Sequence, residues 1–251
     1  MKLSQRISIS FGSNLQEARF IERPNRFIIR CQLQENANKS GGTAQGEVVE
    51  AHLPDPGRLK ELLFPENKVW LRPAASPRRK TAWSAVLCEV PGGNNLVSLD
   101  STLPNRLIAR ALRASAMQEF AGWSLVRPEF QMGSSRWDFL LTGAGGQRLV
   151  LEVKSVTLVK DGVGLFPDAV TRRGAKHVRK LAEIARCQDW QTAILFVVQR
   201  EDVQLIRAAE KIDPDFAAAL LEARTAGVKV FGRKCQLTIQ EAVLAERVAV
   251  E

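Results

Sequence analysis

The stretch SRWDFLLTGAGGQRLVLEVKS, residues Ser135–Ser155, decides the fold of the second half of this chain. Two apolar runs are joined by a glycine-rich segment, a pattern that predicts two antiparallel strands connected by a turn. With the turn centred on Gly145, Leu141 lies opposite Leu149. This register fixes which side chains share a face, because side chains alternate between the two faces of a strand.

Three acidic side chains and one lysine fall together in this register. Asp138 lies opposite Glu152, and Lys154 shares the face of Glu152. Leu125–Gln131 is predicted to be the preceding strand, and a two-residue turn that begins with glycine then places Glu129 opposite Asp138. Like charges opposed across strands destabilise a sheet. A divalent cation would remove that penalty, so the pattern indicates a metal site. A pair of edge strands with a solvated, charged face is the alternative.

Composition indicates a partner that bears phosphate. The 251 residues include 36 lysines and arginines against 27 acidic residues, a formal net charge of +9. An excess of this size is typical of nucleic-acid-binding proteins, although a merely soluble basic protein is the alternative. The four cysteines are scattered without a CxxC pair, and only two histidines are present, which argues against a zinc ribbon or a multi-histidine site. Without a signal peptide or a membrane span, a cytoplasmic location is expected.

The first hundred residues are predicted to form one domain, residues 1–100, built from short strands. Glycine, proline and asparagine separate five β-like runs, and one helix-like piece, Gly57–Phe64, interrupts them. Many short strands in so few residues predict a small barrel or sandwich, and a five-stranded OB barrel fits the count. The runs are Arg26–Gln34, Glu47–Leu53, Lys68–Leu71, Ala82–Val90 and Asn95–Leu99.

Tryptophans and basic residues cluster near the middle of this domain. OB folds bind single strands through aromatic platforms in a basic groove. Tryptophans in small barrels are more often core residues, and the segment SPRRK is equally consistent with a solvated loop. The candidate nucleic-acid contacts are Arg72, Arg79, Lys80 and Trp83, beside Trp70 and Arg78.

The remaining residues, 101–251, predict a mixed sheet flanked by helices. Thr102 or Asn105 can cap the first helix, Thr171 the second, and Asp213 a third that ends at Gly227. The predicted elements, besides the three strands above, are helices over Leu103–Phe120, from Thr171 to about Cys187 and from Asp213 to Gly227, and strands over Thr192–Val198, Val228–Phe231 and Cys235–Ile239, with a loop over Asp161–Asp168.

The second of these helices is crowded with positive charge. Basic side chains recur at positions four apart, which works against a helix unless anions neutralise them. Phosphates would do so, and a solvated basic face is the alternative. The candidate phosphate contacts are Arg173, Lys176 and His177, and His177 is also a candidate acid.

Longer stretches of the sequence resemble the sugar fermentation stimulation protein A (SfsA) family. They are HLPDPGRLKELL, LPNRL, SRWDFLL, LEVKSVTLV, LFPDAVTRRGAKHVRKL and ILFVVQR, in this order, over roughly Arg19 to Val230. An aspartate followed by Glu-x-Lys on the next strand is similar to the PD-(D/E)XK nuclease superfamily. The resemblance implies an OB-like barrel followed by a nuclease-like domain.

The resemblance also implies a catalytic set, Asp138, Glu152 and Lys154. The two carboxylates would bind Mg²⁺ or Mn²⁺, and Lys154 would orient the attacking water and stabilise the transition state. The third metal ligand would be Glu129, or Glu119 on the preceding helix as in some superfamily members.

Two functions stay open at this point. The first is a metal-dependent hydrolase of phosphodiester bonds in DNA or RNA. The second is a non-catalytic, sequence-nonspecific DNA-binding protein with a regulatory role in sugar (maltose) metabolism, as the family name implies. The expected partner is DNA or RNA and not a membrane, and a homodimer stays open.

Overall fold

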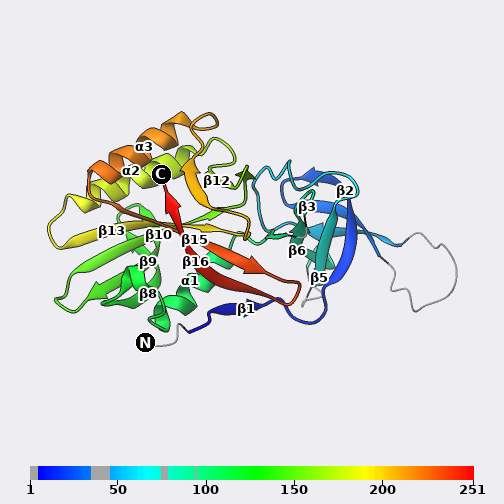
Figure 1. Cartoon of the computed structure of the whole chain (residues 1–251), viewed down its shortest axis with the longest axis horizontal. Helices are drawn as coiled ribbons and strands as arrows, with labels where there is room; N and C mark the ends of the chain where they lie inside the picture. Colours follow the sequence, from blue (N-terminus) through cyan, green and yellow to red (C-terminus); the bar gives the residue numbers. More distant parts are fainter. Residues whose placement is uncertain (1–4, 35–45, 75–78, 94) are drawn as a thin grey trace. The chain divides into compact units, whose positions relative to one another are not determined.

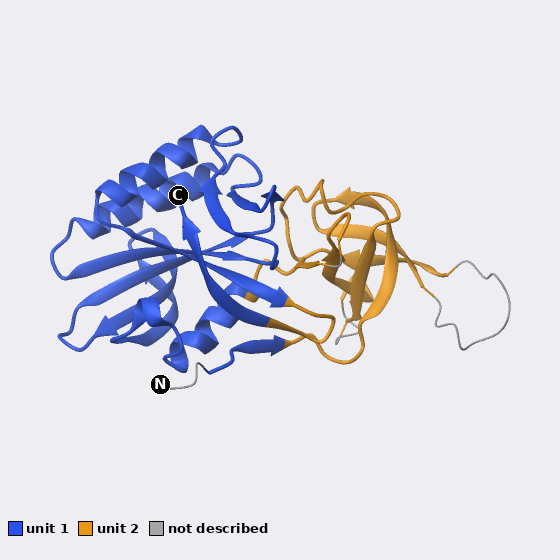
Figure 2. Cartoon of the chain, in the orientation of Figure 1, with its two compact units in different colours: residues 1–9, 104–236, 243–251 blue, residues 10–103, 237–242 orange. Residues whose placement is uncertain are grey.

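The computed structural model describes residues 5–34, 46–74, 79–93 and 95–251, which form two compact units (Figure 2). The first, here called the barrel unit, contains residues 10–103 and 237–242. The second, the mixed-sheet unit, contains residues 104–236 and 243–251 together with the described residues before position 10. The sequence predicts a border at residue 100. The chain crosses between the units close to that position, and it also crosses near both ends.

The barrel unit is a closed barrel of five strands. Strand β4 pairs with β3 on one side and, in parallel, with β6 on the other, so the sheet β4-β3-β2-β5-β6 closes on itself. Side chains that point inward, such as Ile29, Cys31, Val69 and Leu71, are fully buried. This is the OB architecture, as predicted. The strands are β2 (Gln16–Asn25), β3 (Ile28–Leu33), β4 (Val48–His52), β5 (Lys68–Pro73), β6 (Trp83–Glu89) and a short β7 (Leu96–Ser98).

The predicted number of barrel strands is right, but the predicted set of strands is not. Strand β2 is absent from the prediction, and β7 only extends the sheet beside β6. The sequence of β2 does not show a regular alternation of apolar and polar residues, because the pairing of β2 with β3 shifts register on both sides of Glu22. The predicted helix Gly57–Phe64 is a series of turns. The Asp55 carboxylate accepts a hydrogen bond from the Gly57 backbone N–H at 2.8 Å, and Leu59 has a positive φ of 50°, which ends any helical path.

The mixed-sheet unit is built on a large sheet with parallel and antiparallel strands (Figure 1). The meander β8-β9-β10 is antiparallel, whereas β10, β13 and β15 run parallel. The order is β11-β12-β14-β16-β15-β13-β10-β9-β8, and β1 pairs with β16. The strands are β1 (Ser8–Ser10), β8 (Trp123–Met132), β9 (Ser135–Gly143), β10 (Arg148–Val156), β11 (Val159–Lys160), β12 (Val163–Phe166), β13 (Trp190–Val198), β14 (Leu205–Ala208), β15 (Lys229–Leu237) and β16 (Glu241–Val250).

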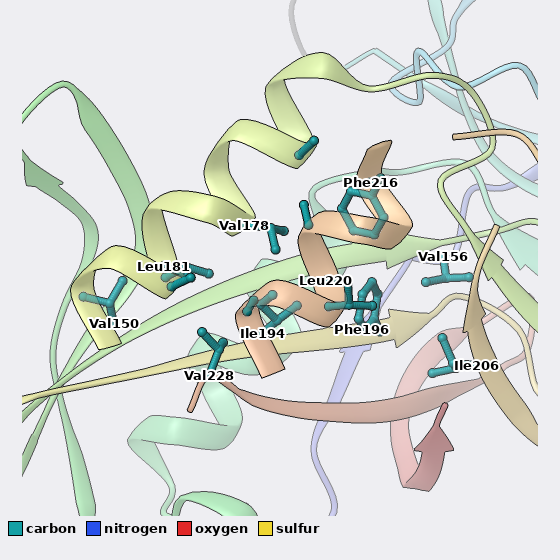
Figure 3. Close-up of a cluster of buried hydrophobic side chains, with 14 of the residues drawn as sticks. Val150, Val156, Val178, Leu181, Ile194, Phe196, Ile206, Phe216, Leu220 and Val228 are labelled. Carbon is teal, nitrogen blue, oxygen red and sulfur yellow. The ribbon is translucent and has the colours of Figure 1, made fainter. Parts of the chain in front are cut away.

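Helices α2 (Arg172–Ala185) and α3 (Pro214–Thr225) lie side by side on one face of this sheet (Figure 1). Figure 3 shows Val178 of α2 and Phe216 of α3 directed toward Ile194 and Phe196 of β13, and all four are buried. Burial of such side chains supplies most of the stability of amphipathic helices.

The predicted caps of both helices are present. The Thr171 hydroxyl accepts a hydrogen bond from the Gly174 N–H, and the Asp213 carboxylate accepts one from Phe216. The other oxygen of Asp213 accepts the N–H of Thr171 at 2.7 Å. One carboxylate therefore caps α3 and fixes the residue that caps α2.

The first helix is shorter than predicted. Helix α1 (Leu103–Arg113) ends before Ser115, which has a φ of 50°, and a separate 3₁₀ turn, η1 (Gln118–Phe120), follows. Glu119 of that turn is held by Arg233 through both carboxylate oxygens, a tertiary contact that overrides helix propensity. The two short strands predicted near the end are a single strand, β15, and the predicted loop over residues 161–168 contains β12. No helix among the described residues is long and apolar enough to cross a membrane.

Candidate active site

Asp138 lies where strands β9 and β10 part. The predicted register is confirmed, with Leu141 opposite Leu149, but the ladder ends at Phe139 and Leu151. Beyond that point the Asp138 carboxylate occupies the gap, and its Oδ2 accepts a hydrogen bond from the Val153 N–H at 2.7 Å. The side chain thus replaces a ladder hydrogen bond, which holds it firmly at the edge of the pairing.

Helix α1 holds the other oxygen of Asp138. The Asn105 side-chain amide donates to Asp138 Oδ1 at 2.6 Å. Sequence reasoning considered Asn105 only as a helix cap, and its place in the stretch LPNRL was the signal that could have identified it. Both oxygens of Asp138 are therefore oriented by neutral donors, which leaves the charge of the carboxylate uncompensated.

Glu152 is the centre of a buried polar cluster on β10. Its Oε1 accepts the Lys154 ammonium at 2.6 Å and lies 3.4 Å from His177 Nδ1. The exposed fractions of these side chains are 8% for Glu152 and 13% for both Lys154 and His177. The fully buried Trp137 ring lies 5.2 Å from the His177 ring, centroid to centroid, and packs against it. The imidazole is thus fixed from both sides.

The two carboxylates have opposite pKa shifts. Burial, and next the negative charge of Glu152, raise the pKa of Asp138 from 3.8 to about 6, although Val153, Lys154 and Asn105 act in the other direction. Burial alone would raise the pKa of Glu152 as well, but Lys154 and His177 outweigh it and lower that pKa. Glu152 is therefore ionised at neutral pH. Asp138, with a pKa of about 6, changes its protonation state just below neutral pH. Paired acids whose environments separate their pKa values are typical of active sites.

A pH dependence follows for the protein without metal. Because the pKa of Asp138 is raised in the folded state, the folded state holds the proton more tightly than the unfolded one between pH 4 and pH 6. Stability is therefore lost as the pH rises through this window, by about 2–3 kcal/mol in total. Glu152 acts in the opposite direction, so wild type must be compared with Asp138→Asn.

We expect urea titrations in EDTA to show that the free energy of unfolding of wild type falls relative to that of Asp138→Asn as the pH rises from 4 to 6, so that the advantage of the variant grows. A constant difference would show that Asp138 is not under electrostatic strain.

The structure does not bring a third acid to this pair. Glu129 has a positive φ of 52°, its side chain is 71% exposed, and it lies 3.8 Å from Arg136. Glu119 has a fully buried side chain paired with Arg233 at 2.7 Å, and its pKa is lowered. No cluster of three acidic, histidine or cysteine side chains suited to a metal ion occurs in the described part of the chain.

Helix α2 contributes His177 to the site and keeps part of its basic face free. Arg173 and Lys176 are exposed, as the predicted phosphate contacts require. Arg179 instead pairs with Asp215 of α3 at 2.6 Å, and Lys180 donates to two serine hydroxyls of the β8–β9 hairpin. Protein groups therefore offset part of the crowded positive charge of this helix.

The predicted contacts on the barrel unit divide into two kinds. Arg72, Arg79 and Lys80 are exposed, and Arg79 also donates to a serine hydroxyl of β6 at 2.8 Å. Trp83 is half-buried and packs against the barrel core, so the alternative of a core tryptophan applies to it. Arg78 lies outside the described residues.

Fold and site together define a class of protein, an OB barrel joined to a mixed α/β domain in which Asp138, Glu152 and Lys154 lie on two adjacent strands. Two family models match the chain, the SfsA N-terminal OB domain over residues 21–99 and the sugar fermentation stimulation protein RE domain over residues 102–241. The chain belongs to the SfsA family.

Relatives cover almost the whole chain. It is 44% identical over 236 residues to the sugar fermentation stimulation protein homolog of Shouchella clausii, covering 94% of this chain and 97% of the relative. The homolog of Moorella thermoacetica is 42% identical over 230 residues, covering 91% and 93%. The structure of Pyrococcus furiosus SfsA in complex with Ca²⁺ superposes with a TM-score of 0.84 at 24% identity, over 98% of this chain and 99% of that one. The likeness shows a shared fold.

Proposed function

We propose that this protein is a metal-dependent hydrolase of nucleic-acid phosphodiester bonds, in which Asp138 and Glu152 hold the metal ion. The observation that supports it most is that the Asp138 carboxylate accepts the N–H of Val153, the residue next to the buried Glu152, because this brings two carboxylates close together in a poorly solvated place. Lys154 and His177 both contact Oε1 of Glu152, and no described residue donates to its Oε2. The pair therefore has the oxygen atoms and the excess negative charge that suit a hard divalent cation.

Each residue of the site has a distinct task. When bound, a divalent ion lowers the pKa of water and offsets charge on a phosphate. Asp138 would hold the ion in its ionised form, so binding should strengthen as the pH rises. Lys154 keeps Glu152 ionised and offers an ammonium group where negative charge develops on the scissile phosphate. Asn105 and the Val153 N–H orient Asp138, and His177 orients Glu152.

Several observations support Mg²⁺ or Mn²⁺ as the ion and nucleic acid as the substrate. The ligands are oxygens, which Mg²⁺ and Mn²⁺ prefer, and a Ca²⁺ complex has been described for the related Pyrococcus furiosus protein. The net charge of +9, the exposed Arg173 and Lys176 on α2, and the OB barrel all suit a polyanion. A cytoplasmic location, where nucleic acids are available, belongs to this proposal.

The test is a cleavage assay with labelled single- and double-stranded DNA and RNA, in Mg²⁺, Mn²⁺, Ca²⁺ or EDTA. We expect cleavage in Mg²⁺ or Mn²⁺ that EDTA abolishes and that Asp138→Asn lacks. DNA binding without cleavage, and without any metal-induced shift in melting temperature, would favour the DNA-binding regulator of sugar (maltose) metabolism instead.

Binding itself should depend steeply on salt. Each phosphate neutralised by a lysine or arginine releases bound counterions, so log K falls linearly with log salt concentration. We expect the affinity for random-sequence DNA, measured in EDTA by fluorescence anisotropy, to drop by at least about tenfold between low and physiological salt. Affinity that does not change with salt would remove nucleic acid as the substrate.

A further inference from the structure

A cavity of about 880 Å³ opens on the barrel unit, and none of its lining residues belongs to the candidate active site. Its walls are residues 12–17, Gln34 after β3, the end of β5 and the turn between β15 and β16. The turn is fixed in place, because the Gln240 carbonyl accepts hydrogen bonds from the Ser10 hydroxyl at 3.3 Å and the Phe11 N–H at 2.8 Å. The volume lies in the range of about 300–1,000 Å³ that small-molecule sites occupy.

The apolar part of the lining contains one aromatic ring, that of Trp70. Trp70 points out of the barrel, since its neighbours Val69 and Leu71 are fully buried in the barrel core. Pro73 and Ile239 lie on the same wall, and Ile239 is 44% exposed. A half-buried indole beside aliphatic groups suits a planar ring that stacks on it.

The polar part of the lining is almost uncharged. Among the described lining residues, Glu17 is the only one with an ionisable side chain, so an anion entering the cavity would be repelled. Side-chain amides both donate and accept hydrogen bonds, as the edges of nucleobases do. The amides are those of Asn14, Gln16, Gln34 and Gln240.

A cationic side chain, that of Arg72, lies next to this cavity. Arg72 follows Trp70 by two residues on β5, so it shares the outer face of that strand, and it is exposed. A ligand with a flat neutral ring and an adjoining negative charge would match both groups.

We propose that this cavity binds an unstacked nucleobase of a single strand, with the base on Trp70 and its phosphate on Arg72. The inference rests on the proposed function only in taking nucleic acid as the partner, and it adds that the partner is single-stranded at this point. Bases inside a duplex are already stacked and paired, so they cannot enter. Stacking on an aromatic side chain tolerates any base.

The test uses the full chain in EDTA, so that cleavage plays no part, with two probes of equal length. One is a short oligothymidylate, and the other is an abasic oligomer that has the same phosphates without bases. Wild type should bind the oligothymidylate more tightly. Trp70→Ala should weaken that binding by about 5- to 100-fold, the range for loss of one stacked base, and should leave abasic binding unchanged.

Three further variants complete the design. Arg72→Ala should weaken binding of both probes by the same factor, and Trp70→Phe should keep most of the preference for bases. Phe27→Ala is the matched control, an exposed aromatic residue of the barrel outside the cavity, and should change nothing. If Trp70→Ala does not fold, Gln16→Ala and Gln240→Ala replace it, and each should reduce the preference.

Equal binding of the two probes by wild type, or a preference that survives Trp70→Ala, would overturn the inference. Hydrolysis of bis(4-nitrophenyl) phosphate by wild type in Mg²⁺ tests the active site separately. If hydrolysis is absent while the Trp70-dependent preference persists, the proposed catalytic function fails and the nucleobase site stands.

Discussion

Replacing Asp138 by asparagine should abolish Mg²⁺-dependent cleavage and raise the melting temperature of the metal-free protein. The pKa of about 6 means that ionising Asp138 at neutral pH costs about 2–3 kcal/mol of folding free energy. An amide has the same shape and keeps an oxygen for the Val153 N–H. It removes the charge, however, and with it a ligand of the proposed ion. The gain in the metal-free state should amount to several degrees.

Thermal melts in EDTA and in Mg²⁺, paired with the cleavage assay, check this result. Asp189→Asn is the matched control, because Asp189 is exposed and its positive φ of 70° suits asparagine equally well. It should change neither melting temperature nor cleavage. If Asp138→Asn keeps full cleavage and the wild-type response to Mg²⁺, Asp138 is not a metal ligand.

Replacing Lys154 by alanine should have the opposite effect on the metal-free protein. Lys154 and Glu152 form a buried pair at 2.6 Å, and removing one partner of such a pair leaves the other charge uncompensated, at a cost of about 3–5 kcal/mol. The melting temperature in EDTA should therefore fall, and Mg²⁺ should restore part of it, because the ion supplies the missing positive charge. Cleavage should fall by at least about a hundredfold, as for other groups that stabilise developing charge.

The same melts and assays separate this variant from the first one. Lys160→Ala, an exposed lysine of β11, is the control and should behave as wild type. The opposite signs of the two shifts in EDTA identify Asp138 as the strained acid and Lys154 as its neutralising partner. A Lys154→Ala protein that melts at the wild-type temperature would contradict the buried ion pair.

The parts of the fold that could be predicted have local causes. The hairpin register follows from a glycine turn between two apolar runs, which places Asp138 beside Glu152. The caps Thr171 and Asp213 follow from side chains that satisfy helix N–H groups. Strand β13 follows from a continuous apolar run buried on both faces. Each of these signals lies within a few residues of the structure it specifies.

What could not be predicted depends on contacts between distant residues. Asn105 reaches Asp138 from a helix 33 positions away, and neither the periodicity nor the capping pattern around it indicates the contact; only its place in the stretch LPNRL marks it. Register alone places Glu129 opposite Asp138, but its positive φ directs the side chain to solvent. Strand β16 is absent from the sequence prediction, because its mixture of charged and apolar residues acquires meaning only when it pairs with β1 and lies between β14 and β15.

The chain passes between the two units four times, near residues 10, 103, 237 and 242, and this limits how the protein can be dissected. A fragment that stops at residue 103 would include the barrel strands but not Ile239 and Gln240, so it would lack one wall of the Trp70 cavity. A fragment that starts at residue 104 would include β16 without its partner β1. Neither unit is formed by one continuous segment of the chain. Truncated chains would therefore lose parts of both units at once, and point substitutions in the full-length protein are the sound way to assign their separate roles.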